Sequence, residues 1–321
     1  MTTGPGPDGT PEPPVVLTIA GSDSGAGAGV QADLKSVAAL GGFAVTAVTA
    51  VTAQNTRAVS AVHPVPTAVV AAQIEAVLGD MPVRATKTGM LATVETISLV
   101  TDLARAGRLP SLVVDPVLVA STGRPLLDGA GIHAMRRLAG SALVVTPNLW
   151  EAALLAGADI AELAGVDAMA EAAARIHGFG ARWVLVKGGH LSGVGPGAGP
   201  APALVPDVLV GESGTHVLEA AHVATDNVHG TGCSLSAAIA TGLARRAADG
   251  GDPGTAVLEA VEDAKRFVHQ ALTGAARWHL GAGHGPLDHL GRLWGHGPAG
   301  RGADHPAAPD GAPAGDGARG A

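Results

Sequence analysis

Short runs of apolar and β-branched residues alternate with helical stretches along most of the chain. The apolar runs occupy residues 15–20, 45–52, 112–115, 142–146 and 183–187. Several are apolar throughout, which is typical of strands covered on both faces of a parallel sheet. Helical patterns lie between them, over about 30–40, 67–79, 93–107, 149–156 and 166–178. This order predicts an α/β fold with a central, mainly parallel sheet flanked by helices on both faces.

The pattern changes in the last third of the chain. A stretch rich in Gly and Pro, LSGVGPGAGPAP, leads into two strand-like segments, 203–210 and 215–220, that predict a hairpin. Two helices are expected after it, over about 233–247 and 254–273. Residues 1–13 and 295–321 are rich in Gly, Pro and Ala and have no apolar face to bury, so we predict disordered tails on either side of one domain, 14–294.

Composition excludes several classes of partner. The chain has 20 Lys and Arg against 28 Asp and Glu, a net charge of −8, and no run of basic residues. Nucleic acid and anionic membranes are therefore not expected partners. The single cysteine excludes an internal disulfide framework and a zinc site built on several thiolates. No signal peptide or membrane-length apolar run is evident, so we expect a cytoplasmic protein.

Thirteen histidines raise the question of a metal site. The three at the C-terminal end of the domain, His279, His284 and His289, are five residues apart and separated by glycines. That spacing does not place them on one face of a helix. We expect them to be structural or solvated.

The first predicted strand runs into a glycine-rich loop, Gly21–Gly29, with a helix expected from about Val30. A turn of this kind at a helix N-terminus can cradle an anion with its backbone amides, although it is also compatible with a simple packing turn. It does not fit the dinucleotide fingerprint, because the third glycine would fall at Val30 and no acidic residue follows the second strand. An NAD-dependent dehydrogenase is therefore excluded on spacing.

A second glycine turn, HGTGCS at 229–234, precedes a helix expected to begin near Cys233. The amides from Gly230 to Cys233 would point into one pocket and hold negative charge that develops during phosphoryl or acyl transfer. A lone cysteine is more often a small buried hydrophobe than a catalyst. Its place at a helix N-terminus predicts a lowered thiol pKa and favours a catalytic role.

Four polar residues lie at the ends of predicted parallel strands, where open α/β sheets bind their ligands. They are Asp115, Asn148, Glu151 and Lys187. Each alone is more simply read as a capping or surface group. Two carboxylates and a lysine that converge there suit Mg²⁺ and phosphates.

The motifs together resemble one enzyme family. They are TIAGSDSGAGAGVQADLK (18–35), VTAVTAQNT (48–56), KTGML (87–91), VVDPV (113–117), TPNLWEA (146–152), VKGGH (186–190) and HGTGCSLSAAIA (229–240). In this order they resemble the hydroxymethylpyrimidine/phosphomethylpyrimidine kinases of thiamine biosynthesis, members of the ribokinase-like superfamily. The resemblance covers nearly all of 15–290.

The resemblance implies a ribokinase-like fold and an activity. The activity is phosphorylation of 4-amino-5-hydroxymethyl-2-methylpyrimidine, and of its monophosphate to the diphosphate, with ATP and Mg²⁺. Cys233 would deprotonate the substrate hydroxymethyl group. The amides of Gly230, Thr231, Gly232 and Cys233 would form the anion hole. Members of the family often form dimers, so a homodimer is compatible with the resemblance.

The same motifs imply ligands for ATP and for Mg²⁺. Lys187 would contact the ATP phosphates, with Asn148 also in the ATP site. Asp115 and Glu151 would organise Mg²⁺, in part through water.

A further set would hold the aminopyrimidine. Asp33 and Gln54 would hydrogen-bond to it, because its edge offers paired donors and acceptors. Gly21, Met90 and Val117 would line its pocket.

The sequence differs from the family motif at one position, and two other functions are compatible with the same motifs. Val228 stands where the family has threonine, which removes a hydroxyl near the nucleotide site. A pyridoxal kinase is the nearest rival, and Gln54 and Met90 favour the pyrimidine over it. A non-catalytic pyrimidine-binding module is a rival of another class. The residues that argue against it are the intact Lys187, Asp115, Glu151 and HGTGC.

Overall fold

The computed structural model of the chain describes residues 12–118, 128–189, 203–252 and 254–291. They form one nine-stranded sheet in the order β3-β2-β1-β4-β5-β6-β7-β8-β9. The parallel strands are β1 (Val15–Asp23), β2 (Phe43–Gln54), β4 (Val83–Thr88), β5 (Val113–Val114), β6 (Val144–Val145) and β7 (Trp183–Lys187). The antiparallel strands are β3 (Val59–Pro64), β8 (Leu204–Gly211) and β9 (Gly214–Ala221). The predicted mainly parallel sheet is confirmed.

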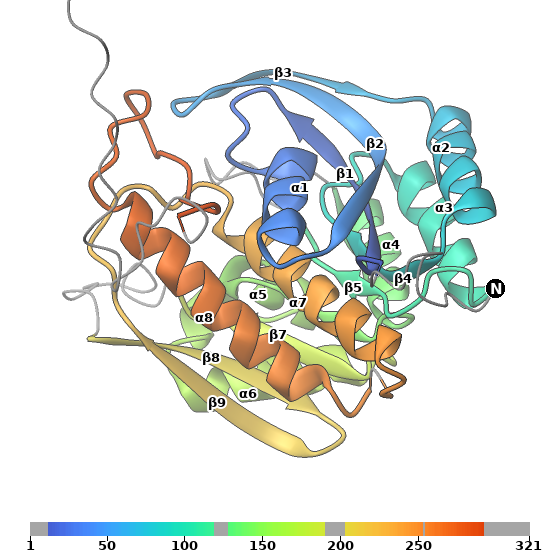
Figure 1. The fold of residues 1–321 in the computed structure, drawn as a ribbon. Coiled ribbons are helices and arrows are strands. Elements are labelled where there is room, and N and C mark those ends of the chain that lie inside the picture. The colour runs from blue at the N-terminus through green and yellow to red at the C-terminus, as the bar shows by residue number, and fades with distance from the viewer. Residues whose placement is uncertain (1–11, 119–127, 190–202, 253, 292–321) are drawn as a thin grey trace, which may run out of the picture.

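Helices cover both faces of this sheet (Figure 1). One face packs against α1 (Gly29–Ala39), α7 (Thr231–Ala248) and α8 (Val257–Ala275). The other packs against α2 (Thr67–Asp80), α3 (Val94–Arg105), α4 (Gly129–Ala139), α5 (Leu149–Ala156) and α6 (Val166–His177), with a short 3-10 turn at Ile160–Glu162. Two hydrophobic cores result, and consecutive residues of a buried strand supply them alternately: Val16 and Leu17 of β1 lie on opposite sides.

Strand order explains why the site forms where it does. The chain moves outward from β1 to β2 and β3, then returns past β1 to β4 and continues outward to β7. A reversal of this kind opens a crevice beyond the carboxyl ends of the strands. Parallel pairing brings Ile19 of β1 level with Thr88 of β4. The residues that follow β1, β4, β5, β6 and β7 therefore meet at one edge.

The hydrophobic pattern predicted most of these elements. All seven expected helices and the late hairpin are present, while β3, β4 and α4 were not predicted. Helix α7 begins at Thr231, two residues before the expected start. The predicted tails, except for residues 12 and 13, and the whole LSGVGPGAGPAP stretch lie outside the described residues. Within the described ranges, no helix is long and apolar enough to cross a membrane.

The segment after α8 braces the start of α7. The backbone N–H of His229 donates to the Gly285 carbonyl at 3.0 Å, and His289 Nε2 lies 2.7 Å from Ser234 Oγ. Ser234 Oγ donates its single hydrogen to the Gly230 carbonyl at 2.8 Å, so His289 Nε2 is the donor in the other bond. Burial, aided by the positive charge of Lys35, lowers the pKa of His289 to about 4. His289 is therefore structural, as expected.

This buried neutral histidine makes stability depend on pH. Unfolding returns the pKa of His289 from about 4 to about 6.5, so the unfolded chain binds an extra proton between those values. The contribution of His289 to the free energy of unfolding is fully present above pH 6.5. Below that pH it should fall by up to about 1.4 kcal/mol per pH unit. Urea unfolding of the wild type and His289→Gln at pH 7.5 and 5 measures this term. The variant should lose less stability on acidification, and an equal loss in both would contradict it. His284→Gln, at an exposed position, is the control.

Candidate active site

Asp23 organises the first glycine loop. Its carboxylate accepts hydrogen bonds from the backbone amides of Gly25, Gly27 and Ala28, at 2.8, 3.1 and 2.9 Å. Burial opposes its ionisation, but these bonds and one from His229 outweigh that effect and hold the pKa of Asp23 below its ordinary value. The loop was expected to cradle an anion from outside. Its amides instead bind a carboxylate of the chain itself.

The second glycine turn packs directly on the first. Gly230 has φ +89°, and a Cβ there would lie 1.8 Å from the Gly27 carbonyl oxygen. A Cβ on Gly27 would lie 2.2 Å from the His229 ring. His229 Nε2 also reaches Asp23 Oδ2 at 2.8 Å and lies 3.2 Å from Gln54 Nε2. Glycine at 27 and 230 therefore permits the two loops to meet.

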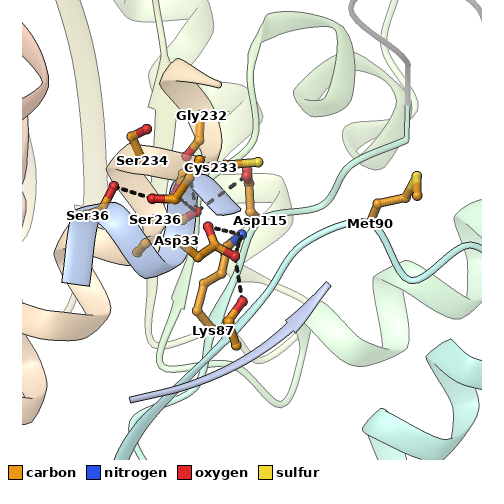
Figure 2. Close-up of polar contacts among 12 residues, drawn as sticks. Asp33, Ser36, Lys87, Met90, Asp115, Gly232, Cys233, Ser234 and Ser236 are labelled. Carbon is orange, nitrogen blue, oxygen red and sulfur yellow. Dashed lines mark hydrogen bonds and ion pairs between the residues drawn. The ribbon is translucent and has the colours of Figure 1, made fainter. Parts of the chain in front are cut away.

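The residues of the predicted anion hole lie at the N-terminus of α7, and their role in binding an anion stays a prediction. Gly230 is the N-cap, and the next three residues, Thr231, Gly232 and Cys233, form the first turn. Amides of a first helical turn have no partner within the helix. The Thr231 N–H donates to the Val228 carbonyl at 3.3 Å. Gly232 and Cys233 lie beside the charged side chains of Asp115 and Lys87 (Figure 2). Of the four amides expected to form the anion hole, that of Thr231 therefore already has a partner in the chain.

The thiol of Cys233 does not have the lowered pKa that its helix position predicted. Burial raises the pKa of Cys233 to about 11. The positive charge of Lys87 and the Gly29 amide act in the opposite direction, while Asp33 and Asp115 add to the increase. Desolvation exceeds the dipole effect, because a buried thiolate loses its water. At neutral pH the residue is a thiol.

Asp115 and Lys187 form an ion pair beside Gly232. Lys187 Nζ lies 3.0 Å from Asp115 Oδ1, which also accepts a bond from Thr146 at 3.2 Å. Burial opposes the Lys187 charge, but Asp115 and then Glu151 keep its pKa above the ordinary value. A Cβ on Gly232 would lie 3.1 Å from Lys187 Nζ. The lysine therefore lies beside the first turn of α7, and its contact with ATP phosphates stays a prediction.

Asn148 and Glu151 cap α5. Asn148 Oδ1 accepts from the Glu151 amide at 2.9 Å, and Glu151 Oε2 accepts from the Asn148 amide at 2.8 Å. Burial raises the pKa of Glu151 to about 7, against the pull of Lys187. The simple capping interpretation is therefore confirmed for both residues. Their contacts with ATP and Mg²⁺ stay predictions.

The residues expected to hold the aminopyrimidine divide into two groups. Gly21 and Met90 are in contact, since a Cβ on Gly21 would lie 2.6 Å from Met90 Cε, and Val117 follows two residues after Asp115. Gln54 ends β2 and reaches His229. Asp33 differs, because it is 0% exposed and both of its oxygens bond to Lys87.

Lys87 is the site residue that the sequence reasoning missed. It lies on β4, is fully buried, and is drawn with Asp33 next to Asp115 and Cys233 in Figure 2. The available signal was a lysine inside a short buried strand, in the motif KTGML.

The oxygen donors at the site fit a magnesium ion that keeps part of its water shell. No cluster of three or more His, Cys, Asp or Glu able to hold a metal occurs in the described part of the chain. Mg²⁺ in kinases is commonly held by one or two carboxylates together with substrate phosphates. Asp115 and Glu151, close enough for each charge to affect the other, match that arrangement.

Solved structures identify the class of enzyme. The Staphylococcus aureus pyridoxal kinase in complex with AMP-PCP and pyridoxal is 33% identical, with a TM-score of 0.74 over 88% of this chain and 95% of that one. The phosphomethylpyrimidine kinase from Clostridium difficile is 35% identical, with a TM-score of 0.65 over 80% of this chain and 99% of that one. The fold is that of a ribokinase-like small-molecule kinase.

Sequence comparison gives the family. The phosphomethylpyrimidine kinase family model matches residues 23–288. The hydroxymethylpyrimidine/phosphomethylpyrimidine kinase of Rhizobium meliloti is 46% identical over 283 residues, which are 87% of this chain and 98% of that protein. The chain belongs to the phosphomethylpyrimidine kinase family. It spans only 52% of a longer relative, the bifunctional thiamine biosynthesis protein of Geobacter sulfurreducens.

Gly232→Ala tests the anion hole without damage to the fold. The new methyl group would lie 3.1 Å from the Lys187 ammonium and would push this flexible end of the side chain by a few tenths of an ångström, while alanine favours a helix over glycine by about 1 kcal/mol. We expect kcat to fall about 10²-fold, the cost of losing one such contact, with no fall in melting temperature. Gly79→Ala in α2 is the matched control, since a Cβ there has no neighbour within 4 Å. Equal activity of the two variants would contradict this role.

Proposed function

We propose that the chain phosphorylates 4-amino-5-hydroxymethyl-2-methylpyrimidine and then its monophosphate, with ATP as donor, in thiamine biosynthesis. Family membership and the named relatives support this reaction. The observation that carries it is the start of α7, where a Cβ on Gly232 would lie 3.1 Å from the Lys187 ammonium and 3.7 Å from Asp115 Oδ2. Fixed donors aimed at a transferring phosphoryl group are the main catalytic requirement of such a kinase.

The first phosphorylation needs a proton acceptor. The hydroxymethyl oxygen bonds to the γ-phosphorus of ATP, the bond from that phosphorus to the β,γ-bridging oxygen breaks, and ADP leaves. The hydroxyl proton passes to Cys233 Sγ in the thiolate form. With a pKa of about 11, roughly one thiol in ten thousand is ionised at pH 7. Most of the rate must therefore come from positioning and charge stabilisation.

The second phosphorylation has different needs. Its nucleophile is a phosphate oxygen of the monophosphate, which is largely ionised at neutral pH because the second pKa of such an ester is about 6. No general base is required for that step. The anion hole and Lys187 have more negative charge to hold, since both reacting groups are then phosphates.

The proposal also assigns residues to the pyrimidine, to the nucleotide and to Mg²⁺. Gly21, Met90, Val117 and Gln54 line the pyrimidine side, where Gln54 offers an amide to the ring edge. Asn148 and Lys187 face the nucleotide. Mg²⁺, held by Asp115 and Glu151 together with ATP phosphates, would neutralise charge on those phosphates.

Pyridoxal phosphorylation is a second candidate, because the solved pyridoxal kinase has the higher TM-score, 0.74 against 0.65. Purified protein with ATP should be offered the hydroxymethylpyrimidine, its monophosphate, pyridoxal and ribose in parallel, with products resolved by mass. Mono- and diphosphates from the pyrimidine support the proposal. Turnover of pyridoxal alone would replace it with vitamin B6 salvage, and no turnover would favour a binding module.

Cys233→Ala separates a base from a structural residue. Loss of a general base should lower kcat for the hydroxymethylpyrimidine by about 10²- to 10⁴-fold. The monophosphate step should fall far less, because its nucleophile carries no proton to remove. Steady-state kinetics on both substrates and ATP affinity by calorimetry provide the measurement. Equal losses in the two steps, or a matching loss of ATP affinity, would refute the base role.

A further inference from the structure

A fully buried ion pair lies beneath the anion hole. Lys87 Nζ bonds to Asp33 Oδ1 and Oδ2, each at 2.9 Å, and both side chains are 0% exposed. Thr18 Oγ1 donates to Asp33 Oδ2 at 2.5 Å. Burial opposes the charge on Lys87, but the facing Asp33 carboxylate outweighs it and keeps the pKa of Lys87 above its ordinary value. The hydrogen bonds and the facing carboxylate therefore favour the charged ammonium.

A gain in folding stability does not explain why the Lys87–Asp33 pair is buried. Two charges lose their hydration on burial, and apolar residues of the same volume commonly stabilise a core as well or better. The surroundings are suited to apolar residues, since Val16, Val37 and Ala85 of the same face are fully buried.

The position of the pair indicates its role. A Cβ on Gly89 would lie 2.9 Å from Lys87 Nζ, so the ammonium lies beside the backbone that leads into Met90, a residue assigned above to the pyrimidine side. Figure 2 shows the Lys87 side chain running from its strand towards the residues that begin α7. Its charge also acts on Cys233. Lys187 stands by Gly232 on the nucleotide side, so the site has a second cation.

We propose that Lys87 is a fixed positive charge that stabilises the negative charge developing at the start of α7 during phosphoryl transfer, and that Asp33 is the positioning residue that holds it there. The proposal rests on the kinase function proposed above. It assigns Asp33 to Lys87 instead of to the aminopyrimidine. Its physical basis is that a preorganised charge in a water-excluded site acts strongly on a transition state and needs no rearrangement.

Geometry supports this reassignment of Asp33. Both carboxylate oxygens already accept strong bonds, and no part of the side chain is exposed to a ligand. Contact with the pyrimidine would require the buried Lys87 to lose its partner, and an unpaired buried charge is costly.

The double variant Lys87→Met with Asp33→Asn tests the proposal. It removes both charges together, so no buried charge is left unpaired, and the amide oxygen that replaces the carboxylate can still accept from Thr18. We expect kcat to fall about 10²-fold while the KM for the pyrimidine changes less than about threefold. A KM increase with kcat preserved would restore Asp33 as a substrate ligand and overturn the proposal. Retained kcat and KM would overturn it as well.

A binding measurement decides the matter independently of the natural substrate. ADP with aluminium fluoride mimics the transferring phosphoryl group, and its affinity can be compared with that of ADP alone by calorimetry. The double variant should bind the ADP–aluminium fluoride pair at least about tenfold more weakly, with ADP affinity unchanged. Unchanged affinity for both would refute the role of Lys87. Failure of the wild type to phosphorylate the pyrimidine would instead refute the proposed function.

Controls separate this effect from general destabilisation. Leu138→Ala removes a fully buried side chain from α4, on the opposite face of the sheet, and should lower the melting temperature without lowering kcat. If the double variant does not fold, Thr18→Val keeps both charges and removes only the hydroxyl that fixes Asp33. It should lower kcat by about tenfold with KM unchanged, and wild-type kcat would contradict the proposal.

Discussion

The contact between two glycine turns determines the geometry of the site. Gly230 can approach the Gly27 carbonyl only because neither residue has a side chain, and His229 and Asp23 join the turns with one hydrogen bond. This contact fixes where α7 begins, and hence where the amides of its first turn point. The same turn is also held by two hydrogen bonds of Ser234, one to the Gly230 carbonyl and one from His289. Other groups of the site are arranged around this fixed start.

Charge at the site is balanced in pairs. Lys187 has Asp115 as its partner and Lys87 has Asp33, so the charged groups nearly cancel before substrates bind. A buried cation without a carboxylate would lose its proton or destabilise the fold. The pairing keeps two ammonium groups charged beside one helix N-terminus. Burial raises the pKa of Glu151 to about 7, so the charge of this carboxyl can change near neutral pH.

The sequence predicted those features that depend on residues close together in the chain. Buried runs and helical periodicity predicted most strands and helices, and the Asn148–Glu151 spacing carries the capping box within four residues. Strand β4 was missed because VRATKT has two basic residues and no apolar run. The bond between Asp33 and Lys87 joins residues 54 apart and depends on β1 pairing with β4. The Cys233 pKa depends on its loss of water, which no local pattern records.

The protonated state of Cys233 also affects the chemical durability of the enzyme. Oxidants and electrophiles react with thiolates, and a thiol with a pKa of about 11 presents very little thiolate at neutral pH. The chain has no other cysteine to form a disulfide with it. The desolvation that makes the proton-accepting thiolate scarce at neutral pH thus also slows reaction of Cys233 with peroxide and alkylating agents.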